Sequence, residues 1–150
     1  MNVPEFENQI NINSVIVINN QKYKILEIVK FRADDSSTYL KCYLENDFIL
    51  AGDSSANTYL LMKPVNCSLP FPYTKELFFD NKNFKFLFEA HAVAKEIYGE
   101  DIFFKINEGE KFWDYSGPDG YYLSLGISDV DSHKADHYGK IIQPEELEIL

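Results

Sequence analysis

The sequence predicts a mainly β domain: an antiparallel meander, a small barrel or a two-layer β structure with at most one or two short helices. Three observations lead to this prediction. Aromatic residues make up 15% of the 150 residues, and aromatic side chains favour strands. Short apolar runs alternate with polar turns over residues 14–63, as in meanders and barrels. Residues 112–125 have the pattern of an aromatic hairpin around Gly117-Pro118-Asp119-Gly120.

Five strands are predicted in the first half of the chain. The apolar run 14–18 indicates a buried strand, and residues 22–31 are rich in β-branched and aromatic residues. After polar turns, further strands are predicted at 38–44, 48–51 and 58–63. Three prolines then predict an extended loop, so the segment 64–73 is the candidate boundary between two sub-layers of a single domain spanning residues 1–150.

The segment 84–99 fits two structures. Helix-forming residues over 89–98, followed by Gly99, favour a helix. Apolar residues at every second position favour a strand with one apolar face, and they are Phe84, Phe86, Phe88, Ala90, Ala92 and Ala94. We predict a long strand. Near the end of the chain, Pro144 followed by two glutamates predicts a single helical turn.

Charge and composition narrow the classes of function. The net charge is −10 and Arg32 is the only arginine, which argues against nucleic-acid binding and is compatible with a cationic protein partner. The apolar runs are too short to cross a bilayer, and residues 1–7 lack the features of a signal peptide. We therefore expect no membrane insertion and a cytoplasmic protein whose Cys42 and Cys67 stay reduced. The sequence leaves the oligomeric state open.

Several short motifs follow one another in a recognisable order. They are a strand–turn–strand opening at 15–29, Gly99-Glu100, Gly109-Glu110, Trp113-Asp114-Tyr115, and Tyr138-Gly139 followed by Ile141. This order resembles the bacterial domain of unknown function 4178, over nearly the whole chain. The resemblance implies a β-rich intracellular domain and no particular reaction. Where that family tends to have acidic residues before the aromatic-Gly pair, this chain has His133 and His137.

The densest group of candidate ligating side chains consists of Asp129, Asp131, His133, Asp136 and His137. A zinc site needs a third ligand at a suitable spacing, which this pattern lacks, so we predict no metal and no cofactor. His91 and Glu89 share a strand face and are candidates for an acid–base pair. The more common alternative for such a pair is a partly exposed neighbour contact.

The aromatic hairpin supplies the candidate binding residues, which are Trp113, Tyr115, Tyr121 and Tyr122. The alternative that we favour for Trp113 is a place in the core, because Trp is highly buried on average. The leading functional hypothesis is a non-enzymatic module that binds another macromolecule. One alternative is a small metal- or His-dependent hydrolase built around His91, His133 and His137. Another is an acidic immunity-type protein that neutralises a basic toxin.

Overall fold

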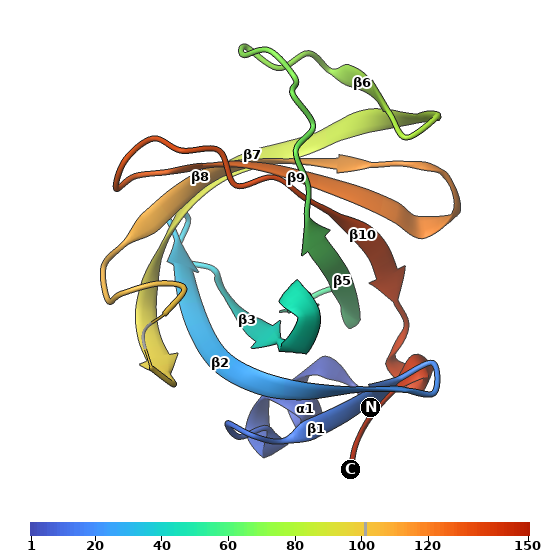
Figure 1. The fold of residues 1–150 in the computed structure, drawn as a ribbon, viewed down its shortest axis with the longest axis vertical. Helices are drawn as coiled ribbons and strands as arrows, with labels where there is room; N and C mark the ends of the chain where they lie inside the picture. The colour runs from blue at the N-terminus through green and yellow to red at the C-terminus, as the bar shows by residue number, and fades with distance from the viewer. Residues whose placement is uncertain (101) are drawn as a thin grey trace.

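The computed structural model describes residues 1–100 and 102–150, and in this part of the chain eight antiparallel strands close into a barrel (Figure 1). Around the barrel the strand order is β2-β3-β4-β5-β10-β9-β8-β7, and β7 pairs with β2 to close it. The strands are β2 (Gln21–Ala33), β3 (Thr38–Leu44), β4 (Ile49–Asp53), β5 (Thr58–Pro64), β7 (Lys82–Tyr98), β8 (Gly109–Ser116), β9 (Tyr121–Ser128) and β10 (His137–Ile142). The predicted mainly β fold is confirmed.

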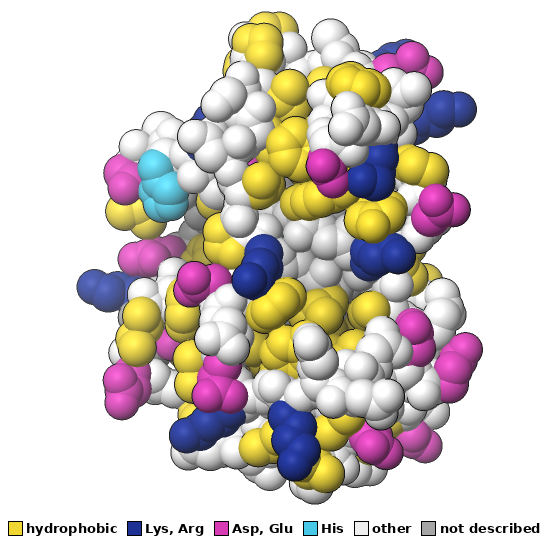
Figure 2. All heavy atoms as spheres, turned by 45° about the vertical axis from the view of Figure 1, so that its right-hand side comes forward, with side chains coloured by type: hydrophobic (Ala, Val, Ile, Leu, Met, Phe, Trp, Pro, Cys, Tyr) yellow, Lys and Arg dark blue, Asp and Glu magenta, His cyan; other side chains and the backbone are white. Residues whose placement is uncertain are grey.

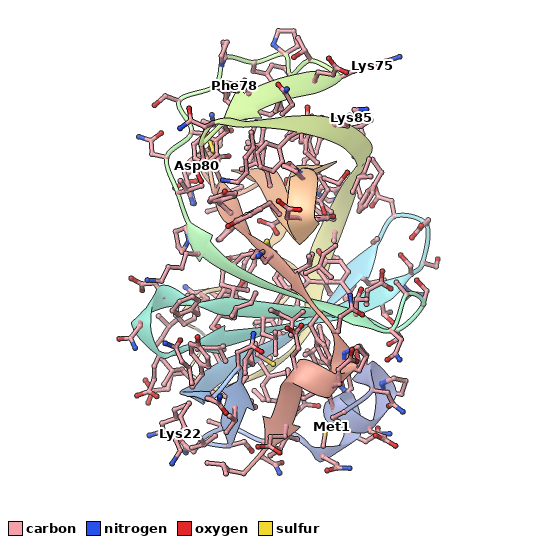
Figure 3. The ribbon with its side chains drawn as sticks, turned by 90° about the vertical axis from the view of Figure 1, so that its right-hand side faces the viewer. Met1, Lys22, Lys75, Phe78, Asp80 and Lys85 are labelled. Atoms are coloured by element: carbon pink, nitrogen blue, oxygen red, sulfur yellow. The ribbon has the colours of Figure 1, made fainter. Side chains whose placement is uncertain are left out.

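Smaller elements extend the sheet at its two ends. Strand β1 (Val15–Ile18) pairs with β2 and with β11 (Leu147–Ile149), whereas β6 (Glu76–Phe79) pairs with β7. Short 3-10 turns lie at η1 (Glu45–Asp47), η2 (Pro118–Gly120) and η3 (Pro144–Glu146), and η3 is the predicted C-terminal turn. In Figure 3, Met1 lies at one end of the molecule, and Phe78 of β6 lies at the other.

The α-helix α1 (Val3–Gln9) was not expected from the sequence. The Asn2 side chain caps it by accepting a hydrogen bond from the Glu5 amide at 2.9 Å, and Pro4 occupies its first turn. Its buried side chains, Val3 and Phe6, face the barrel wall. None of the helices in the described ranges is long and apolar enough to pass through a membrane.

Strand β7 is 17 residues long, which confirms the predicted strand over the alternative helix. The prediction that its even-numbered apolar residues share one face is wrong. The pairing with β8 shifts between Phe86 and Phe88, so Phe86 lies opposite Tyr115 whereas Phe88 lies opposite Asp114. Such an irregularity turns the following residues to the other side of the sheet. Phe84 and Phe86 therefore point out of the barrel, and the residues from Phe88 to Ala94 on this face point into it.

The β8–β9 hairpin turns at residues 117–120, as predicted. Asp119 (φ 56°) and Gly120 (φ 79°) adopt the left-handed backbone conformation that reverses the chain. The Gly117 amide donates a hydrogen bond to the Tyr121 carbonyl oxygen at 2.8 Å, which closes the turn. The hairpin places alternate residues of two aromatic-rich strands on opposite sides of the barrel wall.

Two apolar clusters cover the outside of the barrel. In the first, α1, β1 and β11 pack on the outward side chains of β2 to β5, including Leu40, Cys42 and Tyr59. In the second, Phe84, Trp113, Tyr115, Leu123 and Leu125 lie under side chains of the 64–73 segment and β6. Apart from Pro64, which ends β5, the 64–73 segment is an irregular chain, as the prolines predicted. It runs over a barrel to which both halves of the chain contribute strands.

Candidate functional site

The interior of the barrel contains two adjoining cavities, which we call together the lumen. The larger has a volume of about 700 Å³ and the smaller about 320 Å³. Both are bordered by Lys41, Glu110 and His137, which come from three different strands. An eight-stranded barrel is just wide enough to be filled by side chains or to hold one small ligand. In this barrel the side chains leave part of the lumen unfilled by protein atoms.

Strand alternation decides which residues reach the lumen. On β3, Tyr39, Lys41 and Tyr43 line the cavities, whereas the residues between them belong to the first outer cluster. Small residues keep the lumen open, and those that line the larger cavity include Ala33, Ala51, Ala90, Ser124 and Gly126. At Gly126 even a Cβ atom would lie 2.8 Å from the carbonyl oxygen of Ala135.

Two buried carboxylates extend from β8 into the lumen. Glu110 forms an ion pair with Lys41 at 2.8 Å. Asp114, only 6% exposed, accepts hydrogen bonds from the Tyr122 hydroxyl and from the Ser124 hydroxyl, the latter at 2.6 Å. Burial raises the pKa of Asp114, and the two hydroxyl donors, with the nearby Lys41 charge, offset part of that effect. Asp114 thus has only uncharged hydrogen-bond donors within the described part of the chain.

Two further groups of the lumen, the His137 ring and the Tyr39 hydroxyl, are uncharged at neutral pH. Burial, with the nearby Lys41 charge, lowers the pKa of His137 to about 4. The ring of Tyr39 stacks on Phe31 at 5.2 Å and meets Phe112 edge-on at 6.1 Å. Its buried hydroxyl has no hydrogen-bond partner among the described residues. A buried hydroxyl without a partner carries a free-energy cost, which a bound molecule can remove.

Acidic residues outnumber basic ones along the cavities and at their openings. Of the 24 Asp and Glu residues, eight line one or both cavities, and they are Asp35, Asp47, Asp53, Glu89, Glu108, Glu110, Asp114 and Asp131. Lys41 is the one Lys or Arg among the described lining residues. On the face shown in Figure 2, by contrast, acidic side chains are dispersed among basic ones. Of the eight lining carboxylates only Glu110 and Asp114 are buried, whereas most of the others are exposed at the openings of the cavities.

Aromatic residues after β7 pack at the smaller cavity. Phe103 stacks on Tyr43 with a centroid distance of 4.3 Å, and Phe104 meets Phe31 edge-on at 5.0 Å. The fully buried Glu27 carboxylate accepts hydrogen bonds from the amides of Ile102 and Phe103, at 2.9 and 3.1 Å. This anchor holds the two aromatic rings against the wall of the barrel.

The four aromatic residues proposed from the sequence do not form one site. Trp113 and Tyr115 point outward and are buried in the second outer cluster, which is the core position favoured for Trp113. Tyr121 stacks on Tyr138 on the same side, at 5.7 Å. Tyr122 alone faces the lumen, where its hydroxyl binds Asp114.

The three histidines also lie apart. His91 points outward and contacts Asp129 at 2.6 Å and Asp34 at 3.3 Å, rather than Glu89, and these contacts raise its pKa. His133 pairs with Asp131 on an exposed loop, whereas His137 faces the lumen. Within residues 1–100 and 102–150, no three His, Cys, Asp or Glu side chains are placed to hold a metal ion.

Sequence reasoning missed the lumen group of Lys41, Glu110 and Asp114. The signal that could have found it is a charged residue inside a strand whose neighbours on both sides are apolar or aromatic, as in Leu40-Lys41-Cys42 and Trp113-Asp114-Tyr115. Charged residues are rarely buried unless they are paired, so such positions mark a polar interior.

Comparisons with protein-family models, with curated proteins and with solved structures found no match. The resemblance to the domain of unknown function 4178 stays a prediction.

Proposed function

We propose that the protein binds one small organic molecule inside the barrel. The observation that carries this proposal is the cavity of about 700 Å³ lined by aromatic and aliphatic side chains with a few converging polar groups. Sites for small molecules in proteins are typically cavities of about 300–1,000 Å³ with this kind of lining. Tyr39, Phe88, Phe112 and Leu60 supply the apolar part, and Asp114 is among the polar groups.

The polarity of the lumen supports a binding site over a simple packing defect. Empty cavities in proteins are generally apolar. This lumen instead holds the Lys41–Glu110 ion pair, the buried Asp114 carboxylate and the unpaired Tyr39 hydroxyl. Burying such groups lowers stability, and apolar residues of similar size would avoid that cost. Their presence is explained if they contact a ligand.

Binding of the neutral fluorescent probe N-phenyl-1-naphthylamine tests this proposal. We expect its emission to rise on addition of the wild-type protein. Ala90→Trp, which places a large ring in the larger cavity, should abolish the rise. Lys85→Trp on the exposed part of the same strand is the matched control and should bind as the wild type does. Absence of binding by the wild type, or equal binding by Ala90→Trp, would contradict the proposal.

A second candidate function is the non-enzymatic macromolecule-binding module expected from the sequence, with a protein as the partner. The observation in its favour is exposed apolar surface on β6 and β7, where Phe78 is 63% and Leu87 48% exposed. Figure 3 places Phe78 at one end of the molecule. A partner that co-purifies with the wild type and with Ala90→Trp, but not with Phe78→Ser, would support it. The hydrolase and the immunity-type function stay predictions.

A further inference from the structure

We propose that the molecule bound in the lumen is an organic cation: an amine or quaternary ammonium group carried on an apolar or aromatic body. This inference rests on the proposed function, because it names the class of ligand that the same cavity takes. Three features of the lumen carry it, namely its charge balance, the surroundings of Asp114, and its aromatic rings.

The charge balance of the lumen favours a positive ligand. Two carboxylates, Glu110 and Asp114, are buried in the lumen against a single lysine, and the charge of that lysine is already matched by Glu110 at 2.8 Å. Exposed carboxylates at the openings of the cavities add further negative charge, and no other lysine or arginine is among the described lining residues. A cavity lined by one sign of charge raises the local concentration of ligands with the opposite sign.

Asp114 is the residue best placed to contact the cation. It is almost fully buried, and its hydrogen-bond donors are the hydroxyls of Tyr122 and Ser124. These donors orient the carboxylate, but they do not neutralise it. Buried charges in proteins are normally paired, and an ammonium group in the larger cavity would supply the missing partner.

The aromatic lining suits the same ligand. Tyr39 and Phe88 each meet Phe112 edge-on, with centroid distances of 6.1 Å, and all three rings line the larger cavity with Asp114. Aromatic faces attract ammonium groups, and the attraction is stronger where water is excluded. The unpaired Tyr39 hydroxyl can in addition accept a hydrogen bond from a protonated amine.

An anionic ligand fits this cavity poorly. It would need the Lys41 ammonium group, which lies in the ion pair with Glu110 and over the ring of Phe31 at 5.2 Å. It would also bring a second negative charge close to Asp114. Like charges brought together in a site of low polarity repel strongly.

Competition between two probes of similar size tests the inference. Bound N-phenyl-1-naphthylamine is displaced with benzyltrimethylammonium and, separately, with phenylmethanesulfonate. We expect the cation to displace the dye at a concentration at least about ten-fold lower than the anion. Asp114→Asn preserves the shape of the side chain and removes its charge. It should weaken binding of the cation about ten-fold more than it weakens binding of the uncharged dye, whose affinity is measured on the same variant. Asp119→Asn, in the exposed turn of the β8–β9 hairpin, is the matched control and should leave both unchanged.

The outcomes separate this inference from the proposed function. If the dye binds and the two competitors are equally effective, or the anion is better, the lumen is a binding site but not one for cations. The same conclusion follows if Asp114→Asn does not change the concentration of benzyltrimethylammonium that displaces the dye. If the dye does not bind the wild type at all, the proposed function itself is contradicted, and the inference with it.

Discussion

The two sides of the barrel wall differ in what they bury. On β8, Trp113 and Tyr115 point outward into a close-packed apolar cluster, whereas Phe112 and Asp114 point inward to the lumen. The outer clusters exclude water through α1, β1, β11 and the 64–73 segment. The inner side combines a smaller apolar cluster around Phe31 and Tyr43 with cavities and charges. We infer from this difference that the packing on the outside of the barrel supplies much of the hydrophobic stabilisation. The interior is therefore free to carry polar groups that cost stability.

The largest difference in stability is expected between alanine variants of two neighbouring residues of β8, one on each side of the wall. Trp113→Ala should lower the free energy of unfolding by about 3–5 kcal/mol, because it empties a buried position. Phe112→Ala should cost only about 1–2 kcal/mol, because that ring already borders an open cavity. Urea denaturation measures both values. Equal losses would show that the lumen side is packed as tightly as the outside.

The free energy of unfolding should fall in acid, because His137 is buried in its uncharged form. Its pKa is about 4 in the folded state against 6.5 unfolded, so the stability present above pH 6.5 is lost as the pH falls towards 4. The full loss amounts to about 3 kcal/mol. His137→Gln should remove this part of the pH dependence when unfolding is measured from pH 4 to 7. An unchanged slope in that variant would place the origin of the acid sensitivity elsewhere.

The outward-facing His91 should behave in the opposite way. Its contacts with Asp129 and Asp34 raise its folded-state pKa above 6.5. Its contribution is therefore complete below pH 6.5 and is lost as the pH rises through the raised value. His91→Gln should reduce stability below pH 6.5 and have less effect at pH 9, by thermal denaturation. The same loss at both pH values would mean that the charge of the imidazole ring does not contribute.

Removal of the buried carboxylate should increase stability at neutral pH. Because burial raises the pKa of Asp114, its contribution is favourable at low pH and is lost as the pH rises through the folded-state value. Asp114→Asn should therefore raise the free energy of unfolding by about 1 kcal/mol at pH 7. Urea denaturation at pH 3 should show no such gain. A destabilised variant at pH 7 would mean that Asp114 holds the β8–β9 wall together.

The smallest effect is expected at the helix cap outside the barrel. Asn2→Ala removes the hydrogen bond to the Glu5 amide and should cost about 0.5–1 kcal/mol. Because α1 packs only on the outer side, binding of N-phenyl-1-naphthylamine should stay unchanged. A change in dye affinity would show that the outer cluster and the lumen are coupled.

The sequence by itself determined the β class, the positions of the strands in the first half and the long strand β7. These features follow from local patterns, such as alternating apolar residues, turn residues and the Gly-Pro-Asp-Gly hairpin. Such patterns depend only on residues that are close together in the sequence. Strands β6 and β11 and helix α1, of four, three and seven residues, are too short to produce a clear pattern. The packing that surrounds them decides whether they form.

Only the tertiary structure decided which side of each strand became the interior. Both sides of the wall carry apolar residues, because the outside is covered too, so alternation does not distinguish them. The shift in β7 pairing near Phe86 and the closure between β2 and β7 are likewise set by contacts far apart in the sequence. Lys41, Asp114 and His137 lie on three strands, and they line one cavity only because the barrel closes.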